Sequence, residues 1–413
     1  MRRRFAIDAA GLSAGAAVNG IAVYGYAAIG SRALGAAGFA PVSVLWTFWA
    51  ITGAALAFPI QHWVIRRIHA DGTEEGVRRA LPRMAALITA LAVGSGLVAW
   101  LERGDLFRRE DVLFPLSVSG IVVGTAVMGV MRGGLAARGR FGATAAAFAG
   151  ESVVRLTLAI VGAAAGWGVE AFALIMLAGF GVVLVWPGAL RFARSGSVDR
   201  NHQLGFLAGI SAGSLLAQFV LTGAPVAMAL AGSAEADITS AFAALALFRA
   251  PYLLGLGVAS RITGTLTSFV VGLDHARLRA AMAITIGGTW LAAAIGASAG
   301  GTVGAPLLRL LFGPEIDLPR QALVLFGAGS GIALGTLVQG LVLISRARWR
   351  SLAAVWSLAM ALGVAWVVAG PGAIPTRAAT GFVLAEALAF VTMLRLEARA
   401  LRVAGRRDAP VAI

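Results

Sequence analysis

Three charged side chains stand inside long apolar stretches of the sequence, where an ion is costly to bury. Glu151 and Arg155 are four residues apart, and an acid that precedes a base at this spacing pairs with it along one helix face. Arg249 lies about ten residues into the stretch 238–270, with no acidic residue one helix turn away. Pro251 follows it, which predicts a bend in the helix beside the charge. An arginine at mid-membrane costs on the order of 3 kcal/mol, so it needs a partner, water or an anionic ligand.

The chemistry that these positions favour is anion binding, because the planar guanidinium group matches the oxygen atoms of a phosphate. For Arg249, an anion-binding or cavity role outweighs a structural bridge to Glu151 or Glu386. For Arg155 two readings carry equal weight. Either the Glu151–Arg155 pair neutralises itself and only fixes its helix, or Arg155 faces a cavity and Glu151 tunes or releases it.

Other polar residues also fall within apolar stretches. Asn19, Gln218 and Gln339 could line a cavity or form hydrogen bonds between helices, and the second reading is favoured for each taken singly. Glu386 is a candidate carrier of a proton or a cation, a role that Glu151 could share. The predicted substrate-binding set is therefore Arg249, Arg155, Glu151, Asn19, Gln218 and Gln339.

Enzyme chemistry has little support in this sequence, and we predict no cofactor or metal. There is no cysteine, which excludes disulfides and thiolate catalysis. The four histidines are far apart along the chain and form no cluster of catalytic or metal-ligand spacing. No GxxxxGK[ST] loop is present to hold the phosphates of a nucleotide.

The elements that must position these residues are membrane-spanning helices. The chain of 413 residues is 59% hydrophobic and only 13% charged, which is far from the composition of a soluble domain. About 20 apolar residues are needed to cross the hydrocarbon core. By that measure the sequence predicts an all-α integral membrane protein with twelve spans: 8–30, 38–62, 81–101, 112–134, 142–166, 170–190, 204–230, 238–270, 278–300, 318–344, 350–370 and 376–396. The segment 303–312 is too short to span and is expected at the interface.

The arginines predict the orientation. Of the 34 basic residues, 24 fall in the termini and the loops on the same side of the membrane as the termini. Seven fall in the loops on the opposite side. Because cytoplasmic loops carry the excess of positive charge, both termini are expected in the cytoplasm. The net charge of +15 is therefore a sign of membrane topology, and we predict no nucleic-acid partner.

An internal repeat divides the chain. GIVVGTAVMG at 120–129 matches GIALGTLVQG at 331–340 at six of ten positions, in the fourth and tenth predicted spans. GLSAG at 11–15 likewise matches GFLAG at 205–209, in spans one and seven. We therefore predict two six-helix lobes, 1–200 and 201–413, related by an axis along the membrane normal. The shared glycines are interpreted as seams where helix backbones pack closely.

The layout resembles the multidrug/oligosaccharidyl-lipid/polysaccharide exporter superfamily over nearly the whole chain. FRAPYLLGLGVASRITGTL at 248–266 is similar to span eight of the polysaccharide flippase branch. RGRFGATAAAFAGESVVRLTLAI at 138–160 is similar to its fourth-loop and fifth-span region. Two departures separate the chain from other branches. Lipid II flippases usually have 14 spans and more arginines in the first lobe. The drug-efflux branch often has an acid deep in span one, where this chain has Asn19, while Asp8 lies at the edge of that span.

The resemblance implies a central cavity between two lobes that opens alternately to either side of the membrane. In the lipid-linked sugar branch, a cationic cavity accepts the pyrophosphate–sugar head group while the polyprenyl tail stays in the bilayer, which suits Arg249 and Arg155. We therefore expect a monomeric flippase of the bacterial inner membrane for a lipid-linked oligosaccharide, with glycosyltransferases or a polymerase as partners. The alternatives are a cation-coupled drug or metabolite antiporter, a lipid II-type flippase, and a membrane scaffold or transferase.

Overall fold

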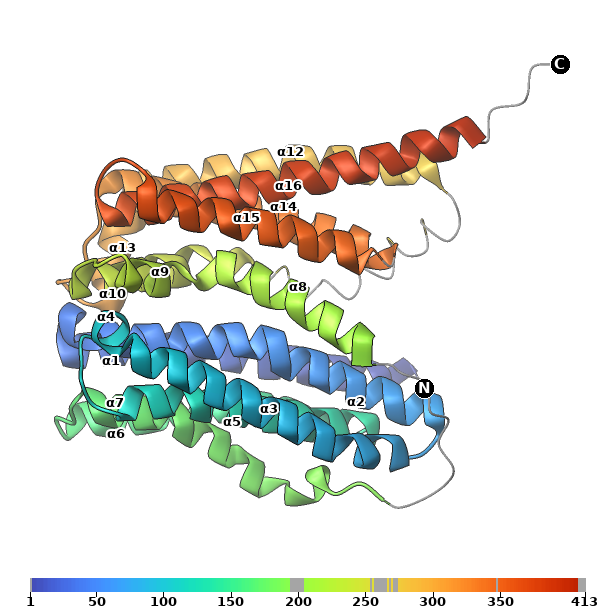
Figure 1. The fold of residues 1–413 in the computed structure, drawn as a ribbon, viewed down its shortest axis with the longest axis horizontal. Helices are drawn as coiled ribbons and strands as arrows, with labels where there is room; N and C mark the ends of the chain where they lie inside the picture. The colour runs from blue at the N-terminus through green and yellow to red at the C-terminus, as the bar shows by residue number, and fades with distance from the viewer. Residues whose placement is uncertain are drawn as a thin grey trace.

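The computed structural model describes residues 2–193, 204–252, 255, 266, 269, 274–346 and 348–407, and within them it contains helices and no strand. The first half of the chain forms α1 (Arg2–Thr52), η1 (Gly53–Ala57), α2 (Phe58–Asp71), α3 (Glu75–Leu101), α4 (Arg103–Phe107), α5 (Leu113–Ala137), α6 (Phe141–Ala164), α7 (Val169–Ala178), η2 (Gly179–Val185) and η3 (Pro187–Leu190). The second half forms α8 (Leu204–Thr222), α9 (Ala224–Leu230), α10 (Glu235–Phe248), α12 (His275–Ala299), η4 (Gly300–Gly304), α13 (Ala305–Phe312), α14 (Arg320–Ser345), α15 (Trp349–Ala369) and α16 (Ile374–Arg407). In Figure 1 the long helices of the first half lie below those of the second.

Eight helices in the described part of the chain are long and apolar enough to cross a membrane, or nine if the bent pair α8 and α9 is one span. α8 and α9 meet at an angle of 72°. The sixth predicted span corresponds to a shorter apolar helix, Val169–Val185. The eighth is described mainly as α10, and most of residues 253–273 lie outside the described residues. The expected all-α membrane fold is confirmed.

The first two predicted spans form one helical stretch, Ala17–His69, which doubles back at Gly35. Gly35 adopts φ 71° and ψ 170°, a backbone conformation that favours glycine. The rings of Tyr26 and Trp46 stack with their centroids 5.2 Å apart. Twenty residues of straight helix would separate them by about 30 Å. The stretch is therefore an antiparallel pair of helices, as the two predicted spans require.

The bundle has two ends, which we call inner and outer. The start of α1 and the end of α16 both lie at the inner end, on the right in Figure 1. The outer end, on the left, carries α4 and α13. The Gly35 turn lies there too, because Arg32 and Ala36 on either side of it contact Leu311 and Glu315. α13 corresponds to the short segment expected at the interface. The arginine distribution predicts that the inner end faces the cytoplasm.

At the inner end, Glu74 forms hydrogen bonds that join its own loop to the segments of Arg138 and Ala193. Its Oε1 atom accepts a hydrogen bond of 2.8 Å from Arg138 Nε, and its Oε2 atom accepts one of 2.7 Å from the Ala193 amide. The hydrogen bond from Arg138 holds the pKa of Glu74 below its usual value of 4.5. A carboxyl group with a lowered folded pKa stabilises the fold above its unfolded pKa, and the contribution is lost as pH falls through the folded value.

We therefore expect a Glu74→Gln variant to show a weaker loss of thermal stability between pH 6 and about pH 3 than the parent protein. The Glu74 side chain is 20% exposed and its pair with Arg138 lies at the surface, so the difference should be at most ~1 kcal/mol. Melting of the detergent-solubilised protein across this pH range measures it. Parallel pH profiles for the two proteins would contradict the assignment.

Candidate functional site

A cavity of about 1060 Å³ lies between the helices of the two halves. One wall comes from α1, η1, α2, α5, α6 and η2, and the other from α8, α14, α15, α16 and the segment after α10. At one end of the cavity stand His62 and Arg66 of α2 and Leu352 near the start of α15. These positions belong to the inner end of the bundle. Aromatic side chains including Trp49, Phe148 and Trp356 make much of the lining apolar.

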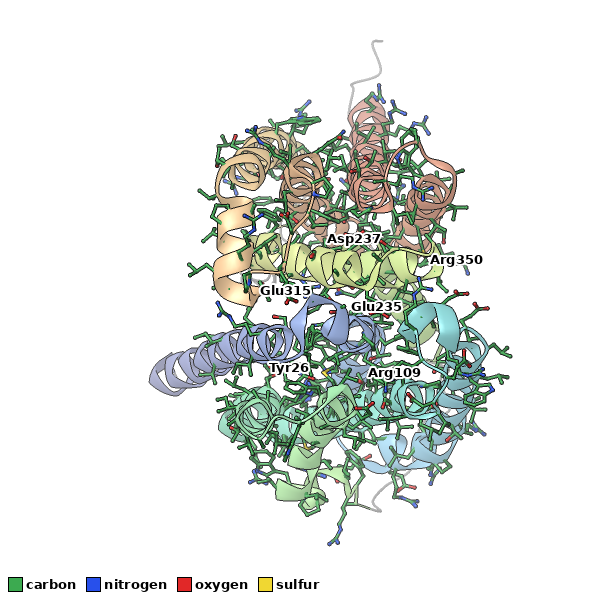
Figure 2. All side chains as sticks on the ribbon, turned by 90° about the vertical axis from the view of Figure 1, so that its left-hand side faces the viewer. Tyr26, Arg109, Glu235, Asp237, Glu315 and Arg350 are labelled. Carbon is green, nitrogen blue, oxygen red and sulfur yellow. The ribbon has the colours of Figure 1, made fainter. Side chains whose placement is uncertain are left out.

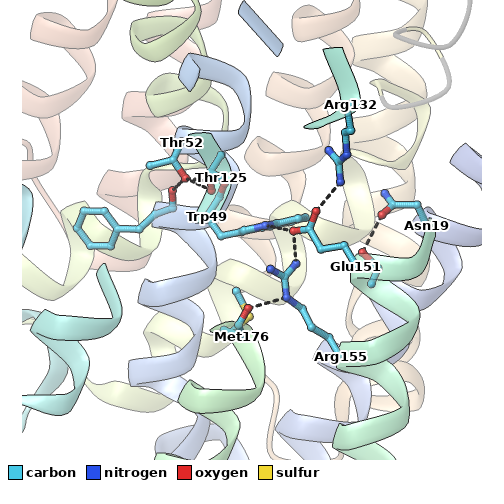
Figure 3. A network of polar contacts seen from close by, with 10 residues as sticks. Asn19, Trp49, Thr52, Thr125, Arg132, Glu151, Arg155 and Met176 are labelled. Carbon is cyan, nitrogen blue, oxygen red and sulfur yellow. Dashed lines mark hydrogen bonds and ion pairs between the residues drawn. The ribbon is translucent and has the colours of Figure 1, made fainter. Parts of the chain in front are cut away.

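Glu151 is the centre of a buried network on the wall of the first half (Figure 3). Its Oε2 atom lies 2.5 Å from a terminal nitrogen of Arg132, and its Oε1 atom lies 2.8 Å from one of Arg155. Trp49 donates its indole N–H to the same Oε1 atom at 2.8 Å. The three donors come from α5, α6 and α1, so one carboxylate joins three helices. Two arginines share a single acid, which leaves this group of side chains with one excess positive charge.

The predicted Glu151–Arg155 pair forms, but Arg155 lies behind the acid and not on the cavity wall. Its side chain is 1% exposed, and its Nε donates to the Met176 carbonyl oxygen at 2.8 Å. The guanidinium carbon lies 4.8 Å from the ring centre of Trp49 and 4.9 Å from that of Phe180, in positions that favour cation–π attraction. Glu151 and Trp49, which line the cavity, stand between Arg155 and the cavity. Direct contact of Arg155 with a substrate stays a prediction that this placement does not favour.

Arg132 lines the cavity instead, although the arginine distribution predicts it at the cytoplasmic end of the span 112–134. It belongs to α5, which continues to Ala137, and its side chain is 7% exposed. The guanidinium carbon lies 4.7 Å from the ring centre of Phe148. Its Nε is buried and has no hydrogen-bond partner. The signal that could have revealed it is its position within the predicted span 112–134.

Arg249 lines the opposite wall, directly after α10 ends at Phe248. The helix break expected beside Pro251 therefore falls at the arginine itself. Its Nε is buried without a hydrogen-bond partner. Among the described residues no ion pair joins Arg249 to Glu151 or to Glu386. Arg132 and Arg249 thus line one cavity from the two halves of the chain, and the Nε atom of each is buried without a hydrogen-bond partner.

Glu386 of α16 lines the same wall as Arg249 and is 1% exposed. Its Oε2 atom lies 2.7 Å from the Thr336 hydroxyl oxygen, which also lies 2.9 Å from the Ala333 carbonyl oxygen. A hydroxyl group has only one proton to donate. Both contacts form at once either when Thr336 shares its proton between the two acceptors or when a protonated Glu386 donates to Thr336.

The three predicted amide side chains are placed differently. Asn19 lines the cavity and accepts a hydrogen bond of 2.7 Å from the Ser152 hydroxyl group. Gln218 lines it from α8, and its amide nitrogen lies 3.4 Å from the hydroxyl oxygen of Thr222. Gln339 does not line the large cavity: it is 1% exposed, and neither of its amide atoms has a hydrogen-bond partner. Substrate binding by these residues stays a prediction.

Comparison with solved structures identifies the fold. The chain is similar to an inward-facing multidrug resistance MATE family transporter of the MOP superfamily, with a TM-score of 0.72, 15% identity and coverage of 95% of this chain and 96% of that chain. An outward-facing transporter of that family gives a TM-score of 0.61, with 15% identity over 96% and 95% of the two chains. A MOP superfamily transporter from Pyrococcus furiosus gives a TM-score of 0.60, with 16% identity over 95% of each chain. That protein is described as having a binding pocket of reverse polarity. No family model and no curated protein matches the sequence.

Proposed function

We propose that this protein is an alternating-access transporter for an anionic amphiphile. The observation that carries the proposal is the pair of cavity arginines, Arg132 and Arg249, each with a buried and unpartnered Nε. A guanidinium group held away from bulk water favours an anion beside it, because the anion offsets the cost of keeping the positive charge there. The greater similarity to an inward-facing transporter agrees with a cavity that reaches the inner end.

Within this class, the substrate that suits the cavity best is a lipid-linked oligosaccharide or related surface-glycan precursor. Its pyrophosphate needs cations where water is scarce, which the arginines of the two walls supply. Its head group needs room, and the volume lies at the upper limit of ordinary ligand pockets. Its lipid tail would remain in the bilayer. The protein would then work as a monomer in the bacterial inner membrane. Its two lobes, 1–200 and 201–413, would rock about the substrate. Glycosyltransferases or a polymerase would be its partners.

The test is binding of farnesyl pyrophosphate to the purified protein, followed by the fluorescence of the cavity tryptophans. Arg249→Ala and Arg132→Ala should each weaken the dissociation constant by about 10- to 100-fold, because a hydrogen bond to a charged group contributes about 1.5–3 kcal/mol. Arg309→Ala is the matched control, since Arg309 pairs with Asp317 away from the cavity. Farnesol, which has no charge, should bind the parent protein and both arginine variants alike.

Unchanged affinity for farnesyl pyrophosphate in both arginine variants, at normal protein levels, would overturn the anion-site proposal. Glycan export in cells extends the test from binding to transport. There the same two variants should lose export while the Arg309→Ala control keeps it. If binding depends on the arginines but export does not, the substrate is an anion of another pathway.

A cation-coupled antiporter is the second candidate, and Glu386 is the observation that favours it. The residue combines burial, a place in the cavity lining and a hydroxyl neighbour that fits its protonated form. The solved transporters of similar fold that are named for multidrug resistance agree with this alternative. A pH gradient across proteoliposomes should then drive uptake of a cationic drug, and Glu386→Gln should abolish it. Uptake that is insensitive to Arg132→Ala and Arg249→Ala would favour the antiporter over the flippase.

A further inference from the structure

The two halves of the chain are joined by hydrogen bonds at the outer end, where the cavity does not reach. The Gly35 turn of the first half meets the end of α13 and the loop that follows it. Ser31 donates its hydroxyl group to the Phe312 carbonyl oxygen at 2.7 Å. Thr239 of α10 donates to the Ala36 carbonyl oxygen at 2.6 Å. Figure 2 faces this end, and Glu315 lies where the helices of the two halves meet.

Two further contacts between the halves each cap a helix end of the opposite half. Glu315 Oε2 accepts a hydrogen bond of 3.0 Å from the amide of Ala36, which begins the helix that follows the Gly35 turn. Arg32 Nε donates to the Leu311 carbonyl oxygen at 3.1 Å, in the last turn of α13. Acids are favoured at helix N-termini and bases at helix C-termini because the helix dipole attracts them there. Each half therefore satisfies backbone groups that the other half leaves unpaired.

Gly35 is what brings these groups within reach. A Cβ atom at position 35 would lie 2.8 Å from Glu315 Oε2, so a side chain here would push the carboxylate away. The positive φ of the residue also turns the Ala36 amide out of its own helix. The turn and its cap thus depend on each other.

We propose that this pair of exchanged caps, Glu315 on Ala36 and Arg32 on Leu311, is an outer latch that holds the transporter in the state open to the inner end. The latch must part when the cavity opens outward, because its two sides belong to different halves. Water then satisfies the freed backbone groups. The inference rests on the proposed alternating access, but it concerns which state is populated and not which substrate is carried.

The chain contains no cysteine, so one introduced cysteine can report whether the cavity is open to the outside without labelling of other residues of this chain. We place it by Ala54→Cys on the cavity wall and label intact cells from outside with a membrane-impermeant maleimide. Glu315→Ala should raise the initial labelling rate about five-fold, because loss of a helix cap typically shifts an equilibrium by that factor. Arg32→Ala should raise it in the same direction, and Glu315→Gln less, because its amide oxygen still accepts a hydrogen bond.

The matched control is Glu110→Ala, an exposed acid of the outer end that pairs with Arg103 of its own half. It should leave labelling unchanged. Labelling at the parent rate in Glu315→Ala and Arg32→Ala would overturn the latch. If one variant fails to accumulate in the membrane, the other and Glu315→Gln decide the question. The readout needs no substrate, so failure of the substrate proposal leaves this test intact, and failure of the latch leaves the binding assay intact.

Discussion

Replacing Glu151 with alanine is expected to cost the protein about 3–5 kcal/mol of stability. The carboxylate is the shared partner of Arg132 and Arg155, whose side chains are 7% and 1% exposed. Removing it leaves two like charges close together without compensation. Trp49 would lose the acceptor of its indole N–H as well. Thermal unfolding of the detergent-solubilised protein should show a melting temperature lower by at least about 5 °C.

A double-mutant cycle separates the loss of the ion pair from general damage to the site. Arg155→Met keeps an unbranched apolar side chain in place of the arginine and removes one of the two uncompensated charges. The double variant Glu151→Ala/Arg155→Met should therefore be more stable than the sum of the two single changes predicts.

Glu170→Ala serves as the control for the cycle, because Glu170 is 49% exposed and pairs with Arg109 at the surface. It should change stability by less than ~1 kcal/mol. Strict additivity of the Glu151 and Arg155 substitutions would show that the buried pair has no energetic coupling. A loss for Glu151→Ala no larger than that for Glu170→Ala would contradict the role of the network.

The network also shows how far the sequence could predict the site. Glu151 and Arg155 could be paired from their spacing, because a helix fixes the distance between residues four apart. Arg132 comes from another helix, 19 residues away, and no local pattern relates it to Glu151. Which of the two arginines faces the cavity depends on how α5 and α6 are rotated against each other. Hydropathy does not determine that rotation, so the sequence predicts Arg155 for the substrate and places Arg132 with the charges at the cytoplasmic end of its span.

The fold was more predictable than the site because the membrane dictates it. Apolar length alone locates α5, α6, α14 and α15, whose bounds fall within about three residues of the predicted spans. Breaks inside a run are harder to predict. Gly35 reverses the chain and Gly223 bends α8 against α9 by 72°, yet both glycines stand among dozens of others. A glycine at a turn and a glycine at a packing seam look the same in sequence.

The close packing of α12 against α14 predicts the second large loss of stability. A Cβ atom at Gly296 would lie 2.2 Å from the Gly327 carbonyl oxygen, and one at Gly327 would lie 2.0 Å from the Gly296 carbonyl oxygen. One turn further along, a Cβ atom at Gly331 would lie 2.4 Å from the backbone of Ala292. These distances are far below van der Waals contact, and the obstacle is backbone and not a movable side chain. The packing role predicted for Gly331 is confirmed.

We expect Gly296→Val to force the two helices apart and to destabilise the protein by about 3 kcal/mol or more, beyond the usual range for an overpacked core. The outcome should be a low yield of monodisperse protein after solubilisation. Gly288→Val is the matched control in the same helix, because nothing lies within 4 Å of a Cβ atom there. It carries the same change in helix propensity and in apolar surface. A shortage of protein for both variants would point to poor insertion of α12, whereas a shortage for Gly296→Val alone identifies backbone contact as the interaction that holds α12 against α14.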